Sequence, residues 1–315
     1  MITQASNLAF TFPGQGSQSV GMLDNLEKIY PEVKRVFERA SDALGKDLWT
    51  IVSKNPNNEL DQTQNTQPVM LAAGFAVWEI WCRLSSLRPA WMAGHSLGEY
   101  TAMVCSEAMS FEDGIRLVAA RGQLMQNAVP DGIGAMAAIL GLDDHEVIKI
   151  CAEAAGEEIV SAVNFNSEGQ VVIAGHAHAV NRAMLAAKTA GAKRVLLLPV
   201  SVPSHCALME PAAEQLADYL SSIAIDAPKT TSIHNVDVAS HNSPDIIRDV
   251  LKKQLYKPVR WVDTIKFMHK QGVTTFVECG PGKVLVGLNR RIAKAEHAAI
   301  YDPETLENLL ELFND

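Results

Sequence analysis

One stretch of the chain limits the possible folds more than any other, because its predicted elements follow an uncommon order. Between Gly134 and Leu198 the sequence predicts strand, helix, strand, strand, helix and strand, at 135–140, 143–155, 159–165, 170–174, 177–190 and 194–198. This β-α-β-β-α-β order is the split βαβ pattern of a ferredoxin-like unit. Pro130-Asp131-Gly132 and Pro199 flank it and are suitable boundaries. We therefore expect a small ferredoxin-like domain, residues 131–198, inserted into a larger one.

The two flanking segments, 1–130 and 199–315, predict one large α/β domain. A strand at Leu8–Phe12 ends at Pro13-Gly14, and a short strand at Trp91–Gly94 leads directly into a helix. Other helices are predicted at 31–44, 68–84, 111–129, 207–220, 244–255, 262–271 and 283–295, and a further strand at 275–278. The helix from Pro68 is apolar nearly all round and should be buried. Because a strand, a sharp turn and a helix at 91–98 are typical of α/β hydrolases, we expect a hydrolase-like fold here.

Composition excludes several classes of protein. The chain of 315 residues contains 48% hydrophobic and 20% charged residues, which is ordinary for a soluble globular protein. It has no apolar run of membrane-spanning length, and Met1–Phe12 lacks the features of a secretory signal, so a cytoplasmic location is expected. A net charge of −9 argues against nucleic acid or a membrane surface as partner. The five scattered cysteines contain no C-x-x-C pair and predict neither a metal site nor disulfides.

The segment Gly94-His95-Ser96-Leu97-Gly98 matches G-x-S-x-G, the pattern of a nucleophile elbow. In such an elbow a tight turn between strand and helix exposes the serine hydroxyl, and the small flanking residues let the two elements approach. A tight turn without catalysis is the alternative interpretation. We take Ser96 as the candidate nucleophile that accepts an acyl group.

A serine elbow requires an oxyanion hole, usually formed by the N–H of the next residue and an N–H from a loop after an early strand. Leu97 supplies the first donor, and Gln15, in the glycine-rich loop 13–18, is placed to supply the second. That loop also nearly matches the dinucleotide pattern G-x-G-x-x-G, but serine replaces the third glycine. A later glycine loop, 280–283, resembles a phosphate loop but lacks the first glycine and the Ser/Thr that the phosphate-loop pattern requires.

Serine is a weak nucleophile without a base, and histidine is the usual base. In hydrolases with this elbow the base lies late in the chain, which would favour His269 or His297, although both lie on polar stretches resembling solvated helix faces. His205 follows a strand-like run and a turn, where a side chain can project from the edge of a core. The residues alone leave these alternatives open.

Eight motifs together give the chain a strong resemblance to the malonyl-CoA:acyl carrier protein transacylases of fatty-acid synthesis. They occur in the family's order along almost the whole chain: FPGQGSQ, GHSLGEY, RG-x-x-MQ, GAMAAI, NFNS-x-GQVVIAG, SVPSHC, QLY-x-P-x-RW and GPGKVL. Two positions depart from the family pattern, Glu168 in place of proline and His234 in place of asparagine.

The resemblance implies a role for each matching residue. Ser96 would carry the acyl group, His205 would be its base, and the backbone carbonyl of Gln254 would orient His205 in place of a triad carboxylate. Gln15 and Leu97 would form the oxyanion hole. Read alone, Arg121 would be an ordinary surface charge on a helix; the resemblance makes it the residue that binds the malonyl carboxylate, for which a planar guanidinium is suited. Asn166 and Gln170 would contact substrate from the small domain.

The implied reaction moves malonyl from CoA to the phosphopantetheine thiol of acyl carrier protein, through a malonyl-serine intermediate and without a metal or other cofactor. A serine thioesterase or esterase is the alternative enzyme, and an acyl-CoA binding module without covalent chemistry is the non-enzymatic one. Carrier proteins of this pathway are acidic, so docking on this acidic chain would need a local basic patch. Lys283, Arg290 and Lys294, on one face of the predicted helix, with Arg291 beside them, are the candidates; charges that merely complement the helix dipole are the alternative.

Overall fold

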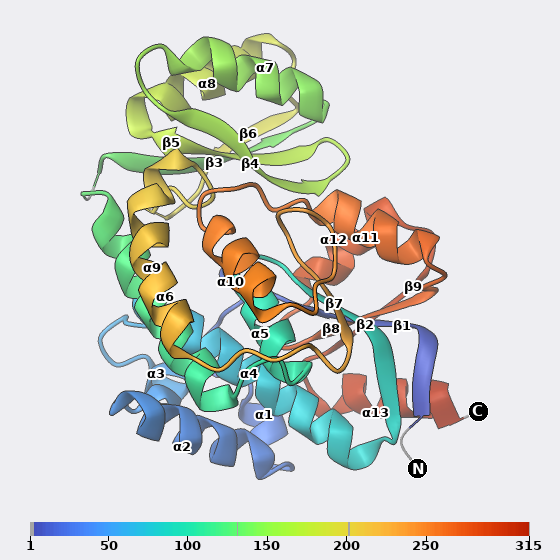
Figure 1. The fold of residues 1–315 in the computed structure, drawn as a ribbon. Coiled ribbons are helices and arrows are strands. Elements are labelled where there is room, and N and C mark those ends of the chain that lie inside the picture. The colour runs from blue at the N-terminus through green and yellow to red at the C-terminus, as the bar shows by residue number, and fades with distance from the viewer. Residues whose placement is uncertain (1–2, 131, 201, 315) are drawn as a thin grey trace.

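The computed structural model describes residues 3–130, 132–200 and 202–314. It has a mixed α/β architecture with one parallel and one antiparallel sheet, and a small unit stands on top of a larger one (Figure 1). Asp131, the first residue of the predicted inserted domain, and Ser201 of the SVPSHC motif lie outside the described residues.

A parallel sheet forms the centre of the large unit. Its five strands lie in the order β7-β2-β1-β8-β9. Their bounds are Thr3–Phe12 for β1, Leu87–Gly94 for β2, Thr231–Ile233 for β7, Thr275–Cys279 for β8 and Glu296–Ile300 for β9. Phe12 pairs with Gly94 at the carboxyl ends of β1 and β2, so the loops that follow these two strands start side by side.

Helices surround this sheet, and the longest of them fills the core. The helices are α1 (Asp24–Glu27), α2 (Glu32–Leu44), α3 (Leu48–Lys54), α4 (Thr63–Leu84), α5 (Leu97–Cys105), α6 (Phe111–Ala128), α9 (Glu210–Ser222) with a 3-10 turn (Ala207–Met209) before it, α10 (Pro244–Lys253), α11 (Trp261–Lys270), α12 (Val284–Ile292) and α13 (Pro303–Asn314). The predicted burial of α4 is confirmed from Val69 to Trp81, where only Phe75 and Glu79 are half-buried. Trp81 packs between Phe10 of β1 and Phe313 of α13, with ring centroids 5.3 and 6.1 Å away.

The small unit consists of residues 134–197. Its strands are β3 (Gly134–Leu140), β4 (Val160–Ser167), β5 (Gln170–His176) and β6 (Arg194–Leu197), paired antiparallel in the order β4-β5-β3-β6. Helices α7 (Asp144–Ala155) and α8 (Ala177–Thr189) cover the face turned away from the large unit, with their own apolar core beneath them (Figure 1).

Strand β4 fixes the small unit against the large one. The Phe165 N–H donates to the Val259 carbonyl at 3.0 Å, and the Val259 N–H donates to the Val163 carbonyl at 2.8 Å. Beside this pairing, Lys266 of α11 lies 2.7 Å from Glu168, one of the two departures from the family pattern. The β4 edge of the small unit therefore lies against the large unit.

Several predicted elements need correction. Helix α4 begins at Thr63 and so contains Pro68 in its interior, where the missing N–H costs the helix one backbone hydrogen bond. The helix predicted to continue to Ala295 ends at Ile292, and the alanine-rich segment after it pairs with β8 as strand β9. His297 therefore lies on a strand and not on a helix face. Elements α1, α3, β7, β9 and α13 were not predicted.

None of the described helices is long and apolar enough to cross a membrane.

Candidate active site

Ser96 lies at the tip of a strained turn between β2 and α5. Its backbone has φ 51° and ψ −109°, a conformation that side chains with a Cβ rarely adopt. The two flanking glycines are required by space, because a Cβ on Gly94 would lie 1.8 Å from the Gly98 carbonyl carbon and one on Gly98 would lie 2.0 Å from the Phe12 oxygen. The Ser96 N–H donates to Asn235 Oδ1 at 2.8 Å, which holds the turn from the far side.

A hydrogen-bonded chain connects the Ser96 hydroxyl to His205 and then to a backbone carbonyl. Ser96 Oγ lies 2.8 Å from His205 Nε2, and His205 Nδ1 lies 2.7 Å from the Gln254 carbonyl oxygen. A carbonyl only accepts hydrogen bonds, so this network assigns the ring proton to Nδ1 and leaves Nε2 free to accept from Ser96. His205 also has a positive φ, 66°, and its N–H donates to the Leu255 carbonyl at 2.8 Å.

His205 is poised to act as a neutral base. Burial, followed by the positive charge of Arg121, lowers the pKa of His205 to about 3. The imidazole is therefore uncharged at neutral pH. The two late-chain alternatives bind elsewhere: His269 Nδ1 contacts the Val273 carbonyl at 2.9 Å, and His297 Nε2 contacts the Ala293 carbonyl at 3.1 Å.

Gln15 and Leu97, the predicted oxyanion donors, both line the cavity above Ser96. Leu97 is the first residue of α5, where a backbone N–H has no acceptor within the helix. The loop that carries Gln15 lies directly against the elbow, because a Cβ on Gly14 would lie 2.5 Å from the His95 oxygen. The parallel register of β1 and β2 thus brings the two predicted donors to one end of the sheet.

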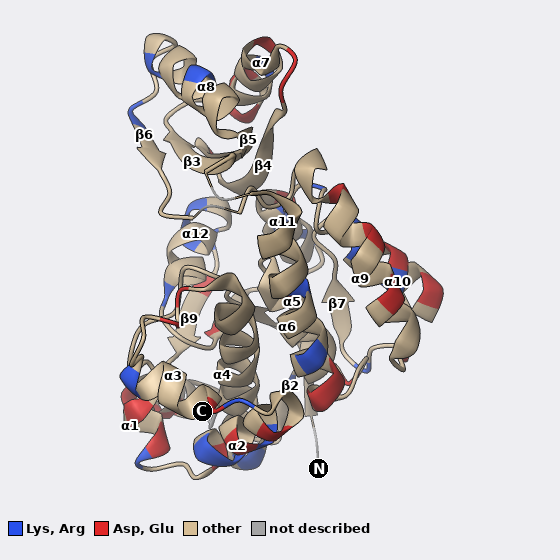
Figure 2. Ribbon diagram, turned by 90° about the vertical axis from the view of Figure 1, so that its left-hand side faces the viewer, with Lys and Arg blue, Asp and Glu red and all other residues tan. Residues whose placement is uncertain are grey.

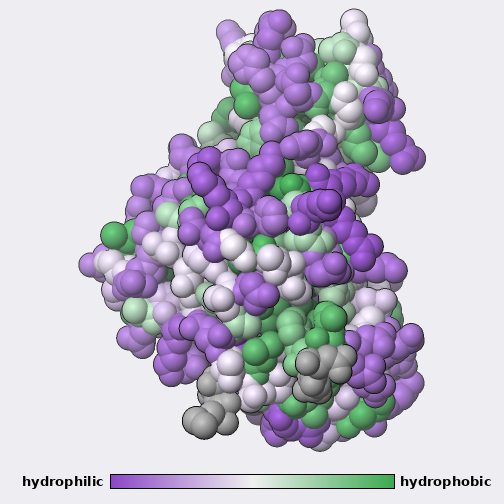
Figure 3. Space-filling model, turned by 90° about the vertical axis from the view of Figure 1, so that its right-hand side faces the viewer, coloured by the Kyte–Doolittle hydropathy of each residue, from purple (hydrophilic) through white to green (hydrophobic). Residues whose placement is uncertain are grey.

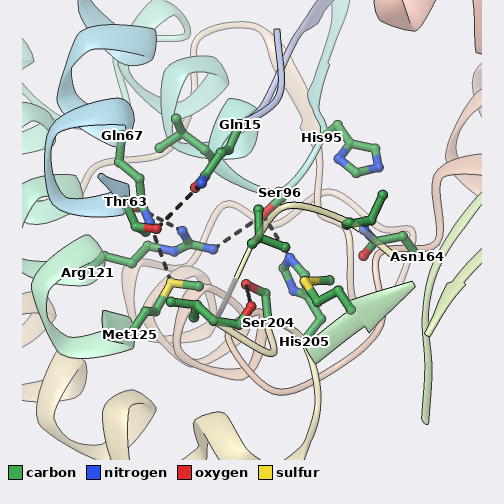
Figure 4. Close-up of a pocket in the computed structure, with 15 residues that line it drawn as sticks. Gln15, Thr63, Gln67, His95, Ser96, Arg121, Met125, Asn164, Ser204 and His205 are labelled. Carbon is green, nitrogen blue, oxygen red and sulfur yellow. Dashed lines mark hydrogen bonds between the residues drawn. The ribbon is translucent and has the colours of Figure 1, made fainter. Parts of the chain in front are cut away.

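Arg121 projects from α6 into the same cavity and is only 1% exposed. Its Nη1 donates to Gln67 Oε1 at 2.8 Å, and its Nη2 lies 3.5 Å from Ser96 Oγ (Figure 4). Nη2 also donates to Gln254 Oε1 at 2.9 Å. Its Nε–H is buried and has no acceptor among the described residues. A lone arginine on a helix would be expected at the surface, but Arg121 is buried against two neutral amides and keeps donor capacity for an anion.

These residues line a cavity of about 130 Å³ between the elbow and the small unit. Its remaining wall is mainly apolar and includes Met125, Met136, Leu198, Val200 and Val202. A small acyl group with one anionic end fits such a cavity, with its apolar part against these side chains and its charge at Arg121.

The two residues of the small unit that we predicted to contact substrate lie outside the lining of this cavity, and their contact with substrate remains a prediction. Asn166 does not line the cavity, because its Oδ1 contacts His95 Nε2 at 2.7 Å. Gln170 also lies outside it, because its Oε1 accepts a hydrogen bond from Arg291 at 3.1 Å. Asn164 of β4 lines the cavity instead.

Three polar residues around Ser96 and Arg121 were not predicted from the sequence. Glu99, Asn235 and Gln67 are buried and hydrogen-bonded around Ser96 and Arg121. A signal for Glu99 exists in the sequence, because it is the only charged residue in the apolar segment Leu97–Cys105. Within the described ranges, no group of three or more His, Cys, Asp or Glu side chains is arranged to bind a metal ion.

Comparison with known proteins relates the whole chain to one family. Residues 9–301 match the model of the acyl transferase domain. The malonyl CoA-acyl carrier protein transacylase of Escherichia coli K12 is 53% identical over 98% of this chain and 100% of its own, and that of Bacillus subtilis is 42% identical over 98% of each. The solved structure of the transacylase from Coxiella burnetii is 50% identical and superposes with a TM-score of 0.95, covering 97% of each chain. A malonyl-transacylase solved in complex with a type II polyketide acyl-carrier protein is 51% identical, with a TM-score of 0.96 over 97% of this chain and 99% of its own.

Proposed function

Because this chain belongs to the acyl transferase family, we propose that its site transfers malonyl from CoA to acyl carrier protein through Ser96. One observation carries this proposal: the serine that is hydrogen-bonded to His205 lies beside a buried guanidinium, with Arg121 Nη2 3.5 Å from Ser96 Oγ. A single methylene separates the two carboxyl carbons of malonyl, so an acyl group attached at Oγ keeps its free carboxylate within reach of Arg121.

The first half-reaction acylates Ser96. Ser96 Oγ attacks the thioester carbonyl while its proton passes to His205 Nε2, and the Gln15 and Leu97 N–H groups stabilise the resulting oxyanion. When the carbon–sulfur bond breaks, His205 returns the proton to the CoA sulfur. The Gln254 carbonyl stabilises the imidazolium that forms between these two steps by accepting its Nδ1–H. No metal or organic cofactor takes part in this scheme.

The second half-reaction runs the same steps in reverse with a different thiol. The phosphopantetheine thiol of the carrier protein gives its proton to His205 and attacks the malonyl ester, and Ser96 leaves with the proton. Arg121 keeps the carboxylate buried in both halves, which favours malonyl over uncharged acyl groups. The thioesterase alternative would require water to replace the second thiol.

We also propose that the small unit has a ferredoxin-like fold and the large unit a hydrolase-like fold. In chain order the strands of the small unit lie as 2-3-1-4, which is the order of a ferredoxin-like sheet. The elbow between β2, an inner strand of the parallel sheet, and α5 supports the hydrolase-like description of the large unit. We therefore propose a large domain made of residues 1–130 and 199–315, and a small inserted domain made of residues 131–198. The proposed location of the protein is the cytoplasm.

Intact-mass spectrometry tests the function directly. After mixing with malonyl-CoA, the protein should gain the mass of one malonyl group, and addition of phosphopantetheinylated carrier protein should remove that mass and transfer it. Repeated release of free malonate without any carrier protein would support the thioesterase instead.

The pH profile should reflect the depressed pKa of His205. An imidazole acts as a base only when it is unprotonated, which is above its pKa; with that pKa lowered to about 3, His205 remains neutral through the mildly acidic range. We expect kcat/KM for malonyl-CoA to change less than about twofold between roughly pH 5 and pH 7.5. A loss of rate with a midpoint at about pH 6.5, the ordinary imidazole value, would contradict this role. Assay at neutral pH after incubation in acid controls for unfolding.

Carrier protein should dock beside α12. Lys283, Arg290, Arg291 and Lys294 are exposed there, and Figure 2 shows basic segments along this helix. Lys294 lies beyond the helix end at Ile292, so the four residues form a patch around α12 and not the single helical face predicted. Figure 3 faces the side on which Figure 1 places α11 and α12; hydrophilic residues gather over its upper and middle parts, and hydrophobic ones lie lower down.

Replacing Arg290 with glutamate should raise the KM for carrier protein by about threefold or more, because a rim charge steers an acidic partner. The KM for malonyl-CoA should be unaffected. Lys34→Glu, an exposed change on the distant helix α2, serves as the control of equal charge. Equal effects of Arg290→Glu on both substrates would refute the docking patch.

A further inference from the structure

The side chain of Gln254 connects the parts of this site that the reaction uses. It is fully buried immediately after α10. Its Nε2 donates to the Ser96 carbonyl at 2.7 Å and to Glu99 Oε2 at 2.8 Å, while its Oε1 accepts from Arg121 Nη2 at 2.9 Å. These contacts are separate from the contact of its backbone carbonyl with His205. One residue therefore touches the nucleophile's backbone, the base and the guanidinium.

Glu99 determines which way the Gln254 amide points. A carboxylate presents only acceptors, so the amide must turn its NH₂ toward Glu99 and the Ser96 carbonyl, and its oxygen toward Arg121. The opposite orientation would place NH₂ against the guanidinium, donor against donor. Glu99 is itself fixed, because Oε2 accepts from the Asn235 N–H at 3.1 Å and Oε1 contacts His234 Nδ1 at 2.7 Å.

The charges of the site support the same arrangement. The hydrogen-bond partners of the buried Arg121 guanidinium are neutral groups, the amides of Gln67 and Gln254 and the Ser96 hydroxyl. The guanidinium also lies 5.2 Å from the centroid of the Tyr100 ring. Burial lowers the pKa of Arg121, and Tyr100 and then the buried carboxylate of Glu99, which is reached through Gln254, oppose this shift. The cation thus has a balancing charge that is kept one side chain away, which leaves its own N–H groups available for a substrate carboxylate.

We propose that Glu99 and the side chain of Gln254 are positioning residues that aim Arg121 at the carboxylate of the acyl group, with His234 holding Glu99. This inference rests on the proposed malonyl transfer and deepens it, because it makes the preference for a carboxylated acyl group depend on a relay behind Arg121. His234 acts through Nδ1, since its buried Nε2 has no partner among the described residues.

A double-mutant cycle on the full chain tests the relay. Gln254→Met keeps the backbone carbonyl that holds His205 but removes the amide, and Glu99→Gln keeps shape but removes the charge. The readout is the ratio of kcat/KM for malonyl-CoA to kcat/KM for acetyl-CoA, with holo carrier protein as acceptor. Each single change should lower this ratio by about 10-fold or more, as expected for a lost hydrogen bond to a charged group.

The double variant decides whether Glu99 acts through Gln254. A relay predicts a loss close to that of the larger single change, whereas independent residues would multiply to about 100-fold or more. Multiplying losses, or single variants with an unchanged malonyl-to-acetyl ratio, would overturn the proposal. If the unaltered protein forms no malonyl adduct, the proposed function itself fails, and that result is separate from these.

Two substitutions at His234 distinguish a positioning role from a merely structural one. The amide nitrogen of asparagine sits as many bonds from Cα as Nδ1 does, so His234→Asn can still donate to Glu99, whereas His234→Leu cannot. The malonyl-to-acetyl ratio should be kept by asparagine and should fall by about threefold or more with leucine. Equal ratios in the two variants, each checked for folding by thermal unfolding, would contradict a role for His234.

Discussion

Replacing Ser96 with alanine should abolish the malonyl adduct and lower malonyl transfer by about 10⁴-fold or more, because no other group can take the place of the hydroxyl between the substrate and His205. Alanine has the same backbone limits as serine, so the strained turn at φ 51° should persist and the protein should fold. Intact-mass spectrometry with malonyl-CoA and a transfer assay give the two readouts.

Ser204→Ala provides the comparison for that variant. Ser204 also lines the cavity, but its hydroxyl donates to the Val202 carbonyl at 3.4 Å and is not part of the His205 chain. This variant should still take up one malonyl group. An adduct that survives in Ser96→Ala, or disappears in Ser204→Ala, would show that the acylated residue has been misassigned.

Removing the guanidinium should have the second largest effect. Arg121→Ala leaves the malonyl carboxylate without its donors in a buried cavity, so kcat/KM for malonyl-CoA should fall by about 10²-fold or more. Acetyl-CoA carries no such carboxylate and should lose far less. Arg121→Lys should also lose activity with malonyl, because a single ammonium cannot provide two parallel hydrogen bonds.

The control for Arg121 lies on the same helix. Arg116 is exposed and pairs with Asp113 at 3.1 Å, so Arg116→Ala should change neither substrate's rate appreciably. If Arg121→Ala lowers malonyl and acetyl transfer in parallel, Arg121 does not bind the substrate carboxylate. Thermal unfolding of both variants separates lost binding from lost folding, since the change also leaves the Gln67 and Gln254 amides without a donor.

Local patterns predicted most of the fold because they coincide with local structure. Gly45 ends α2 with a φ of 64°, and the Ser110 hydroxyl caps α6 by accepting from the Asp113 N–H at 3.1 Å. Strand β9 was missed because its alanine-rich sequence also suits a helix, and only the neighbouring strand β8 decides between them. The three-residue strand β7 is too short to show a pattern.

Only those site residues that belong to a recognisable sequence motif could be predicted. The G-x-S-x-G pattern between a predicted strand and a predicted helix was enough to indicate Ser96. His205 and Arg121 needed the family resemblance, because no spacing rule connects them to Ser96. The positions of Asn166 and Gln170 outside the cavity lining could not be predicted, because a motif shows which residues recur and not where their side chains point. The pairing of Gln170 with Arg291 joins residues far apart in the chain, which no local pattern can reveal.

The hydrogen bonds at Ser96 also indicate at what stage of folding the active site forms. They join residues separated by 109, 139 and 158 positions in the chain, at His205, Asn235 and Gln254. Contacts between residues so far apart in the chain close large loops. The entropy lost in closing these loops opposes folding before the contacts can stabilise the native state. A refolding chain should therefore recover helical signal well before it recovers acyl transfer, which makes enzymatic activity a late marker of the native state.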